Sequence, residues 1–197
     1  MILLPAVFAG VVIAMLRGGS FQRLATLPFR LGWLALICLA AQLVVIYWPA
    51  GGLEAQRPLH AALLIVSSVA LLLVVWANRG IAGIPLLGLG LLLNLVVMSA
   101  NGGFMPVSRE AVLSAGTRSS TDTLVEGARL PKSKDILLPV EDTRLWFLSD
   151  AIVAPPPVGR VYSIGDLIVG AGVIVLLQAA MVPKRRPWTE KESSTTA

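Results

Sequence analysis

Five long apolar runs constrain the fold of this chain more than any other feature of its sequence. They contain a single Asp, Glu, Lys or Arg residue, Asp166. The runs cover residues 2–16, 31–48, 60–77, 81–100 and 163–182. A helix of about 20 apolar residues crosses a bilayer core about 30 Å thick. The runs therefore predict an all-α membrane protein, a bundle of five transmembrane helices of which the first is short.

Composition agrees with this class. Apolar residues make up 56% of the 197 residues and charged residues 14%, which is typical of membrane proteins that cross the bilayer several times. The one cysteine, Cys38, excludes an internal disulfide and a cysteine metal cluster. The net charge of +5 comes from basic residues near the ends of the apolar runs, so it indicates membrane interfaces and not nucleic acid.

Small residues in two of the runs predict close packing between helices. Ala6, Gly10 and Ala14 repeat every four residues, which predicts a smooth stripe for close packing on another helix. Gly88 and Gly90 favour close packing of the fourth run. No basic residue precedes the first run and no small-x-small site follows it, which favours a membrane span over a cleaved signal peptide.

The basic residues of the short connections predict the orientation. Eight of them lie in one set of connections and the tail, against Arg57 alone in the opposite set. The eight are Arg17, Arg23, Arg30, Arg79, Lys184, Arg185, Arg186 and Lys191. Because cytoplasmic connections carry the excess of Lys and Arg, we expect the N-terminus and the loop 101–162 outside. The tail 183–197 is expected in the cytoplasm and, being polar, disordered.

The first half of the outer loop contains local helix signals. Asn101-Gly102-Gly103 is a helix stop, because glycine adopts the left-handed conformation that ends many helices. Ser108 is expected to cap a short helix that runs through Ser114. Residues 115–129 are predicted to be irregular.

The second half predicts another short helix. Asp142 is placed to cap a helix over residues 143–152, whose apolar face would lie on the membrane surface or over the mouth of the bundle. That face comprises Leu145, Trp146, Leu148 and Ile152. The three prolines at 155–157 predict an extended segment leading to the last span.

Four motifs in this order resemble a bacterial integral membrane family known as domain of unknown function 5317. They are Asn101-Gly-Gly-x-Met-Pro-Val, Lys134-Asp135-x-Leu-Leu-Pro, Phe147-Leu-x-Asp150 and Tyr162-Ser-Ile-Gly-Asp166. The resemblance extends from the first run to the fifth. It implies an uncharacterised protein of the bacterial plasma (inner) membrane and no particular activity.

A second, partial similarity is to lipoprotein signal peptidase, an intramembrane aspartyl protease. Asn101-Gly-Gly-Phe is similar to its Asn-x-Gly box, and the segment before Asp166 to its Phe-Asn-x-Ala-Asp segment. This similarity implies that Asp150 and Asp166 act as a carboxyl pair that activates water and protonates an amide. The chain lacks the Asn-x-x-Asp-Arg box of that family and has five spans in place of four.

The polar candidates also have structural interpretations. Asp166 follows Ser163 at the spacing of a helix capping box. Asp150 is expected to face water near the end of its short helix. His60, the one histidine, would be a metal ligand without a histidine partner. Asn94 and Gln42 lie mid-span, where an amide usually bonds to a neighbouring helix.

The sequence leaves three functions open. The leading one is a non-catalytic accessory or scaffold subunit that contacts the bilayer and a protein partner or a second copy. The residues expected to make that contact are Asn101, Gly102, Gly103, Met105, Pro106, Trp146, Phe147 and Tyr162. The alternatives are a hydrolase that uses Asp150 and Asp166, and a small transporter. No cofactor or nucleic-acid partner is expected.

Overall fold

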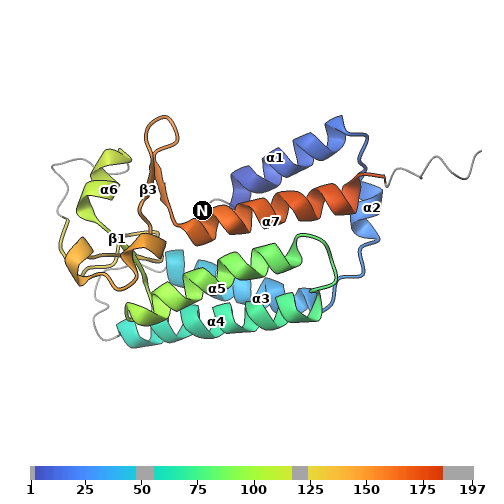
Figure 1. Ribbon diagram of the computed structural model, residues 1–197. Coiled ribbons are helices and arrows are strands. Elements are labelled where there is room, and N and C mark those ends of the chain that lie inside the picture. Colours follow the sequence, from blue (N-terminus) through green and yellow to red (C-terminus); the bar gives the residue numbers. More distant parts are fainter. Residues whose placement is uncertain (1–2, 48–55, 117–123, 184–197) are drawn as a thin grey trace, which may run out of the picture.

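The computed structural model describes residues 3–47, 56–116 and 124–183, most of which are helical. Five apolar helices lie side by side, and a smaller folded region covers one end of them (Figure 1). The helices are α1 (Leu3–Leu16), α3 (Gly32–Tyr47), α4 (Arg57–Ala77), α5 (Ile84–Ala100) and α7 (Ile164–Met181). These bounds lie close to the predicted runs. The connector between α1 and α3 adds a short helix, α2 (Phe21–Ala25), which the sequence analysis did not predict.

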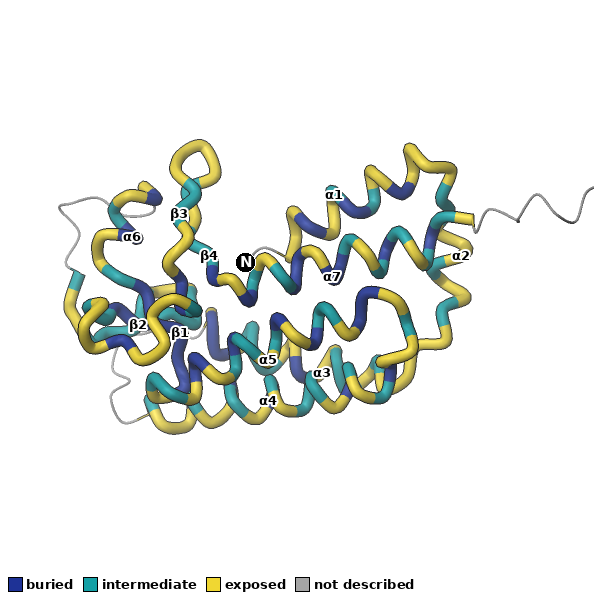
Figure 2. The backbone as a smooth tube through the Cα atoms, in the orientation of Figure 1, coloured by how far each residue is buried: buried dark blue, intermediate teal, exposed yellow. Residues whose placement is uncertain are grey.

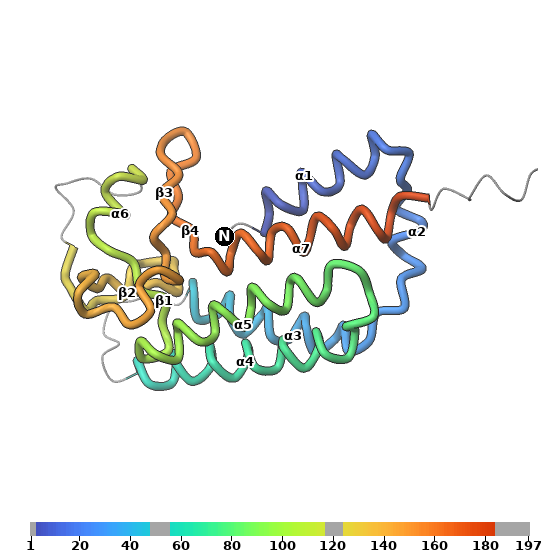
Figure 3. The backbone as a smooth tube through the Cα atoms, in the orientation of Figure 1, coloured from blue at the N-terminus to red at the C-terminus, as the bar shows by residue number. Residues whose placement is uncertain are grey.

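The helices pack in an order that differs from their order in the chain. α1 packs on α7, α7 on α5, α5 on α4, and α4 on α3. The last helix of the chain therefore lies between the first helix and α5 (Figure 3).

The connector between α1 and α3, the turn that contains Arg79 and the end of α7 meet at one end of the helices. The Ser20 amide in the first connector donates to the Met181 carbonyl at the end of α7, at 3.1 Å. The Asn78 side chain, in the turn before Arg79, donates to the Arg30 carbonyl at 2.8 Å. The folded region lies at the opposite end, where α5 ends and α7 begins (Figure 1).

Glycines bring the helix backbones into contact, as the small-residue spacing predicted. A Cβ atom on Gly90 of α5 would lie 2.5 Å from the Gly165 carbonyl oxygen and 2.7 Å from the Val169 nitrogen of α7. The buried residues of α1 are Ala6, Gly10 and Ala14, and a Cβ on Gly10 would lie 2.7 Å from Leu177 of α7. The predicted stripe on α1 is thus confirmed.

Two of the helices, α4 and α7, are long and apolar enough to cross a membrane, whereas α1, α3 and α5 are shorter apolar helices. In α4 and α7 most residues of the apolar window are not buried by the rest of the chain. The exposed positions run along the helices (Figure 2).

The described part of residues 101–162 forms a compact unit, here called the cap. Its strand β1 (Met105–Val107) pairs in parallel with β2 (Asp135–Leu137), and β3 (Ile152–Ala154) pairs antiparallel with β4 (Arg160–Tyr162). It also contains α6 (Arg109–Ser114) and the 3-10 turns η2 (Val140–Asp142) and η3 (Trp146–Leu148). β1 and β2 can pair in parallel because the long segment between them, which includes α6, lets the chain return to the same end before β2 begins.

One apolar core continues from the helices into the cap. Phe104, Met105 and Ile136 of the cap pack with buried side chains of α3, α4 and α5. Those partners are Val45, Leu64, Val97 and Met98. The cap is therefore seated on the helix ends by hydrophobic burial and does not project from them as a separate lobe.

The local helix signals of the first half of the cap are confirmed. The Ser108 hydroxyl accepts from the Ala111 amide at 3.1 Å and begins α6. Gly102 and Gly103 have φ angles of +73° and +91°, and the Gly103 amide donates to the Met98 carbonyl at 2.7 Å. Of the stretch predicted to be irregular, residues 117–123 lie outside the described residues.

The predicted helix over residues 143–152 was wrong. Asp142 ends η2, Leu145 has a left-handed φ of +57°, and Ile152 begins a strand. The apolar spacing predicted a helix, but contacts with other elements determine the conformation of this segment. The Arg144 backbone bonds to the Asn101 side chain, and Leu148 packs against the core that the cap shares with the helices.

The prolines at 155–157 form the turn of the β3–β4 hairpin, and the predicted extended segment was wrong. The Val158 and Gly159 amides donate to the Pro155 carbonyl at 3.1 and 3.3 Å. Proline fixes φ at a value that suits tight turns as well as extended chain, so the sequence alone did not separate the two. Residues 184–197, most of the predicted cytoplasmic tail, lie outside the described residues.

The contact between α5 and α7 predicts the effect of a single methyl group. We expect Gly90→Ala to destabilise the protein by about 1–3 kcal/mol, because the new Cβ meets backbone atoms that cannot move aside. Thermal unfolding in detergent measures the change. Gly80→Ala is the control, since a Cβ there meets nothing within 4 Å. Equal stability of the two variants would contradict the close contact.

Candidate functional site: a polar cluster beneath the cap

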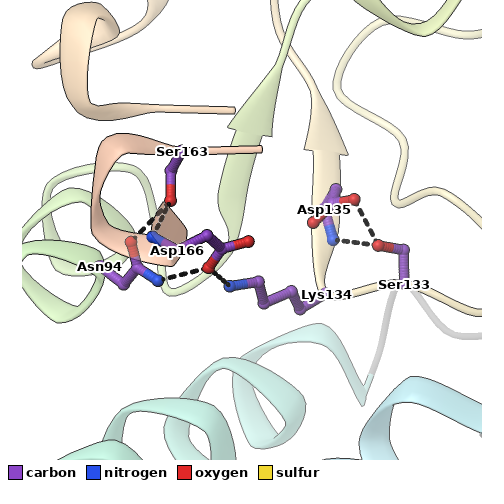
Figure 4. A network of polar contacts seen from close by, with 6 residues as sticks. All are labelled: Asn94, Ser133, Lys134, Asp135, Ser163 and Asp166. Atoms are coloured by element: carbon purple, nitrogen blue, oxygen red, sulfur yellow. Dashed lines mark hydrogen bonds and ion pairs between the residues drawn. The ribbon is translucent and has the colours of Figure 1, made fainter. Parts of the chain in front are cut away.

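The start of α7 is joined to the middle of α5 by hydrogen bonds. Ser163 caps α7, its hydroxyl accepting from the Asp166 backbone amide at 3.0 Å and donating to the Asn94 side-chain oxygen Oδ1 at 2.9 Å (Figure 4). The Asn94 amide donates to the Asp166 carboxylate at 2.8 Å. The predicted interhelical role of Asn94 is confirmed. Of the predicted capping box the structure shows the bond to the Ser163 hydroxyl, whereas the Asp166 carboxylate bonds to the Asn94 side chain. Gln42 likewise donates to Ser67 of the neighbouring helix at 3.2 Å.

Strand β2 brings an ammonium group to the same place. The Lys134 carbonyl accepts from the Met105 amide at 3.1 Å, which fixes Lys134 at the base of the cap. Its Nζ lies 3.9 Å from the Asp166 carboxylate, and the two side chains are 26% and 16% exposed. The Ser133 hydroxyl donates to the carboxylate of Asp135, the first residue of β2 (Figure 4).

Asp150 lies on the other side of β1 and is only 5% exposed. Its amide donates to the Pro106 carbonyl at 3.1 Å, and it bridges to Val107. Among the described residues its Oδ1 atom is buried without a hydrogen-bond partner. The expectation that Asp150 faces water was therefore wrong, because the segment pairs with β1 in place of forming a surface helix.

Burial and mutual repulsion shape the charges of this cluster. Burial raises the pKa of Asp150 well above its usual range, the charge of Asp135 raises it further, and Lys134 opposes the shift. Burial also raises the pKa of Asp135, partly offset by Lys134 and the Ser133 hydroxyl. Burial alone would lower the pKa of Lys134, but Asp166, Asp150 and Asp135 together raise it. The site thus places three carboxyl groups around one ammonium group.

Arg129 extends the site to the end of α3. Its guanidinium donates to the Val45 and Ile46 carbonyls in the last turn of α3 and to the Ser133 carbonyl. A cation at this position satisfies free carbonyls and the negative end of the helix dipole. Burial lowers the pKa of Arg129, and Asp135 offsets part of this change.

His60 lies beside the same guanidinium, with its Nδ1 atom 3.5 Å from an Arg129 nitrogen. Within the described residues no group of three or more His, Cys, Asp or Glu residues is arranged to hold a metal ion.

Comparison with protein families agrees with the four sequence motifs. A model of a family of unknown function (DUF5317) matches residues 26–178. The chain belongs to this family. The match begins after α1, so the expectation that the resemblance includes the first helix was too wide. No curated protein and no solved structure matches the sequence.

Residues from all four motifs quoted in the sequence analysis lie in the cluster or contact the elements around it. Lys134, Asp135, Asp150 and Asp166 form the cluster itself, although no single sequence motif contains them. Asn101 anchors the cap nearby, donating to the Arg144 carbonyl at 2.9 Å and accepting from the Arg144 amide at 3.0 Å.

The residues expected to contact a partner differ in their exposure. Gly103, Met105 and Pro106 are buried between the cap and the helices, and a Cβ on Gly103 would lie 2.5 Å from Ala61 of α4. Trp146 and Phe147 are 54% and 52% exposed. Of the remaining three, Asn101 is partly buried, Gly102 is exposed at the end of α5, and Tyr162 is partly buried in β4.

Sequence reasoning missed Arg129, Lys134 and Asp135 as parts of a site. Lys134 and Asp135 entered the sequence analysis only as part of a motif, and none of the three was given a role. One signal was available: Lys134-Asp135 directly precedes the apolar Ile136-Leu137-Leu138. Charges at the start of a strand that is to be buried must find partners when it folds.

The ion pair at the centre of the cluster predicts the effect of removing Lys134. Loss of one partner of a buried pair costs about 3–5 kcal/mol. Because the Lys134 side chain is 26% exposed, we expect Lys134→Met to cost about 1–3 kcal/mol. Thermal unfolding measures this change, with the exposed Lys132→Met as the control.

A second substitution tests the partner of Lys134. Adding Asp166→Asn to Lys134→Met is expected to restore part of the lost stability, because it removes a carboxylate left without its cation. Simple additivity of the two substitutions would exclude coupling between them.

Proposed function

We propose that the chain crosses the bacterial plasma membrane five times, with the cap on the outer face. Its helices expose long apolar side chains along their length, which suit lipid and would be costly in water. Examples are Leu4, Phe8, Leu16, Leu36 and Val66, each 65% to 83% exposed. The shorter helices α1, α3 and α5 lie alongside the two longer ones, and local thinning of the bilayer accommodates spans of unequal length.

The orientation rests on where the connections lie. The basic first connector, the Arg79 turn and the end of α7 meet at the end away from the cap. The excess of Lys and Arg favours the cytoplasm for that end. The N-terminus and the cap then lie outside and the C-terminus inside.

Cysteine labelling tests this topology. In a Cys38→Ala background, Glu141→Cys on the cap is expected to react with a membrane-impermeant maleimide on intact cells, because Glu141 is exposed. Arg79→Cys, equally exposed in its turn, is expected to react only after the membrane is opened. The reverse labelling pattern would show the opposite orientation. A chain found in the soluble fraction and not in the membrane fraction would contradict the proposal that it crosses the membrane.

For the function we propose a non-catalytic accessory or scaffold subunit that docks a membrane protein partner through its cap. The observation that carries this proposal is the exposed aromatic pair Trp146 and Phe147. Their rings pack edge to face with centroids 6.3 Å apart. Aromatic side chains held on a firm support are frequent centres of binding energy at protein interfaces.

The support for the aromatic pair is rigid. The Ser149 hydroxyl donates to the Trp146 carbonyl at 2.5 Å, and the Leu148 amide donates to the Leu145 carbonyl at 2.9 Å. Asn101 fixes Arg144 just before the pair, and Leu148 just after it packs into the shared core. A surface held in this way loses little conformational freedom when a partner binds.

Mild extraction followed by mass spectrometry tests the docking proposal. We expect a stoichiometric partner with the wild-type chain. The double change Trp146→Ser and Phe147→Ser is expected to weaken its binding about 30-fold or more, the effect of losing about 2 kcal/mol at an interface centre. Stability should hardly change, because both side chains are half exposed. Val158→Ser, another exposed apolar position on the cap, is the matched control.

A second candidate function is favoured by the cluster. The charges of Asp150 and Asp166 both raise the pKa of Lys134, which supports a pair of carboxyl groups near this side chain of the kind that a hydrolase would use. If the chain is extracted without a partner, this candidate takes precedence. It requires hydrolysis of a peptide or lipid-linked substrate that Asp166→Asn abolishes while the protein stays folded.

A further inference from the structure

The buried carboxyl group of Asp150 is the polar group that the fold leaves least satisfied in the described residues. The residue is 5% exposed and its Oδ1 atom has no hydrogen-bond partner. Burying an ionised carboxylate without a donor is costly, and such groups usually take up a proton or a cation. The groups around Asp150 decide between a proton and a cation.

The cations nearby are already engaged. Lys134 pairs with Asp166 at 3.9 Å. The Arg129 guanidinium is bonded to three backbone carbonyls, and the carboxylate that acts on it is Asp135. Three carboxyl groups from two strand segments and the start of α7 therefore face one ammonium and one guanidinium group. If all three were ionised, one negative charge would remain uncompensated.

Asp150 is the group that carries this uncompensated charge. Asp166 accepts from the Asn94 amide, and Asp135 accepts from the Ser133 hydroxyl. Asp150 has neither kind of donor on Oδ1. A metal ion is disfavoured as the missing partner, because the described residues contain no set of three or more ligands arranged around one point.

We propose that Asp150 is a proton-binding site whose proton holds the cap on the ends of the helices. Protonation removes the uncompensated charge. Deprotonation adds a buried negative charge beside β1, and it weakens the packing of the cap on the helix ends. This proposal goes beyond partner docking and does not depend on it.

The sign of the pH effect follows from the direction of the shift. The charged groups that face Asp150 from the elements around it are Lys134 and Asp135 of the β2 segment and Asp166 of α7. Together with burial they raise its pKa well above the usual value. The folded protein therefore binds the proton more tightly than the unfolded chain does. Its stabilising effect is complete below the ordinary aspartate pKa and is lost as pH rises through the folded-state pKa.

Thermal unfolding of the full chain in nanodiscs between about pH 4 and pH 8 tests the proposal. We expect the wild-type midpoint to fall as pH rises, by several degrees over this range. Asp150→Asn keeps the neutral form at every pH, so the fall should be at most half as large; the rest belongs to Asp135. Asp142→Asn, an exposed acid of the cap, should follow the wild-type profile. Parallel profiles for wild type and Asp150→Asn would overturn the proposal.

A measurement on the wild-type protein decides the matter even if Asp150→Asn does not fold. Infrared spectroscopy of protein labelled in its aspartate carboxyl groups is expected to show a protonated buried carboxyl group at pH values where an exposed aspartate is already ionised. Hydrogen exchange at residues 134–138 and 150–154 is expected to quicken as that signal disappears with rising pH. Ionisation of every aspartate in the range of exposed aspartates would overturn the proposal. Loss of the partner-binding surface at Trp146 and Phe147 would leave this result unchanged.

Discussion

The fold depends on the polar contacts that join α5, α7 and β2 at the base of the cap. Asn94 and Ser163 bond to each other, Asn94 donates to Asp166, and Lys134 reaches the same carboxylate from the strand. Each of these groups would be costly to bury alone. They are satisfied only when the cap, the middle of α5 and the start of α7 are all in place, so the cap and the helices stabilise one another.

That meeting requires helix backbones in direct contact. Gly90 and Gly165 face each other, and a Cβ on Gly165 would overlap the Asn94 amide that organises the cluster. Apolar burial then completes the seat of the cap, since Phe104, Met105 and Ile136 share a core with three helices. Arg129 adds a bond from the cap to the end of α3. The buried residues of the family motifs thus serve the assembly of the chain.

The two proposals use different faces of the cap. The titratable groups Asp135, Asp150 and Asp166 lie beneath it, whereas Trp146 and Phe147 lie on its exposed side. The turn that carries the aromatic pair is tied to the end of α5 through Asn101. Ser149 and then Asp150 follow this turn. A change in the charge of Asp150 therefore occurs three residues after Phe147, on the same segment.

The sequence by itself determined the elements whose signals are local. The apolar runs gave the five helices, the four-residue spacing of Ala6, Gly10 and Ala14 gave the packing face of α1, and Ser108 and Ser163 marked the starts of their helices. Tertiary structure alone decided the rest. The segment after Asp142 has helical spacing, yet Asn101 and the shared core hold it in turns. The polar cluster joins Asn94, Lys134, Asp135, Asp150 and Asp166, which are distant in the chain. Strand pairing and helix packing bring these residues together, and no local sequence pattern predicts those contacts.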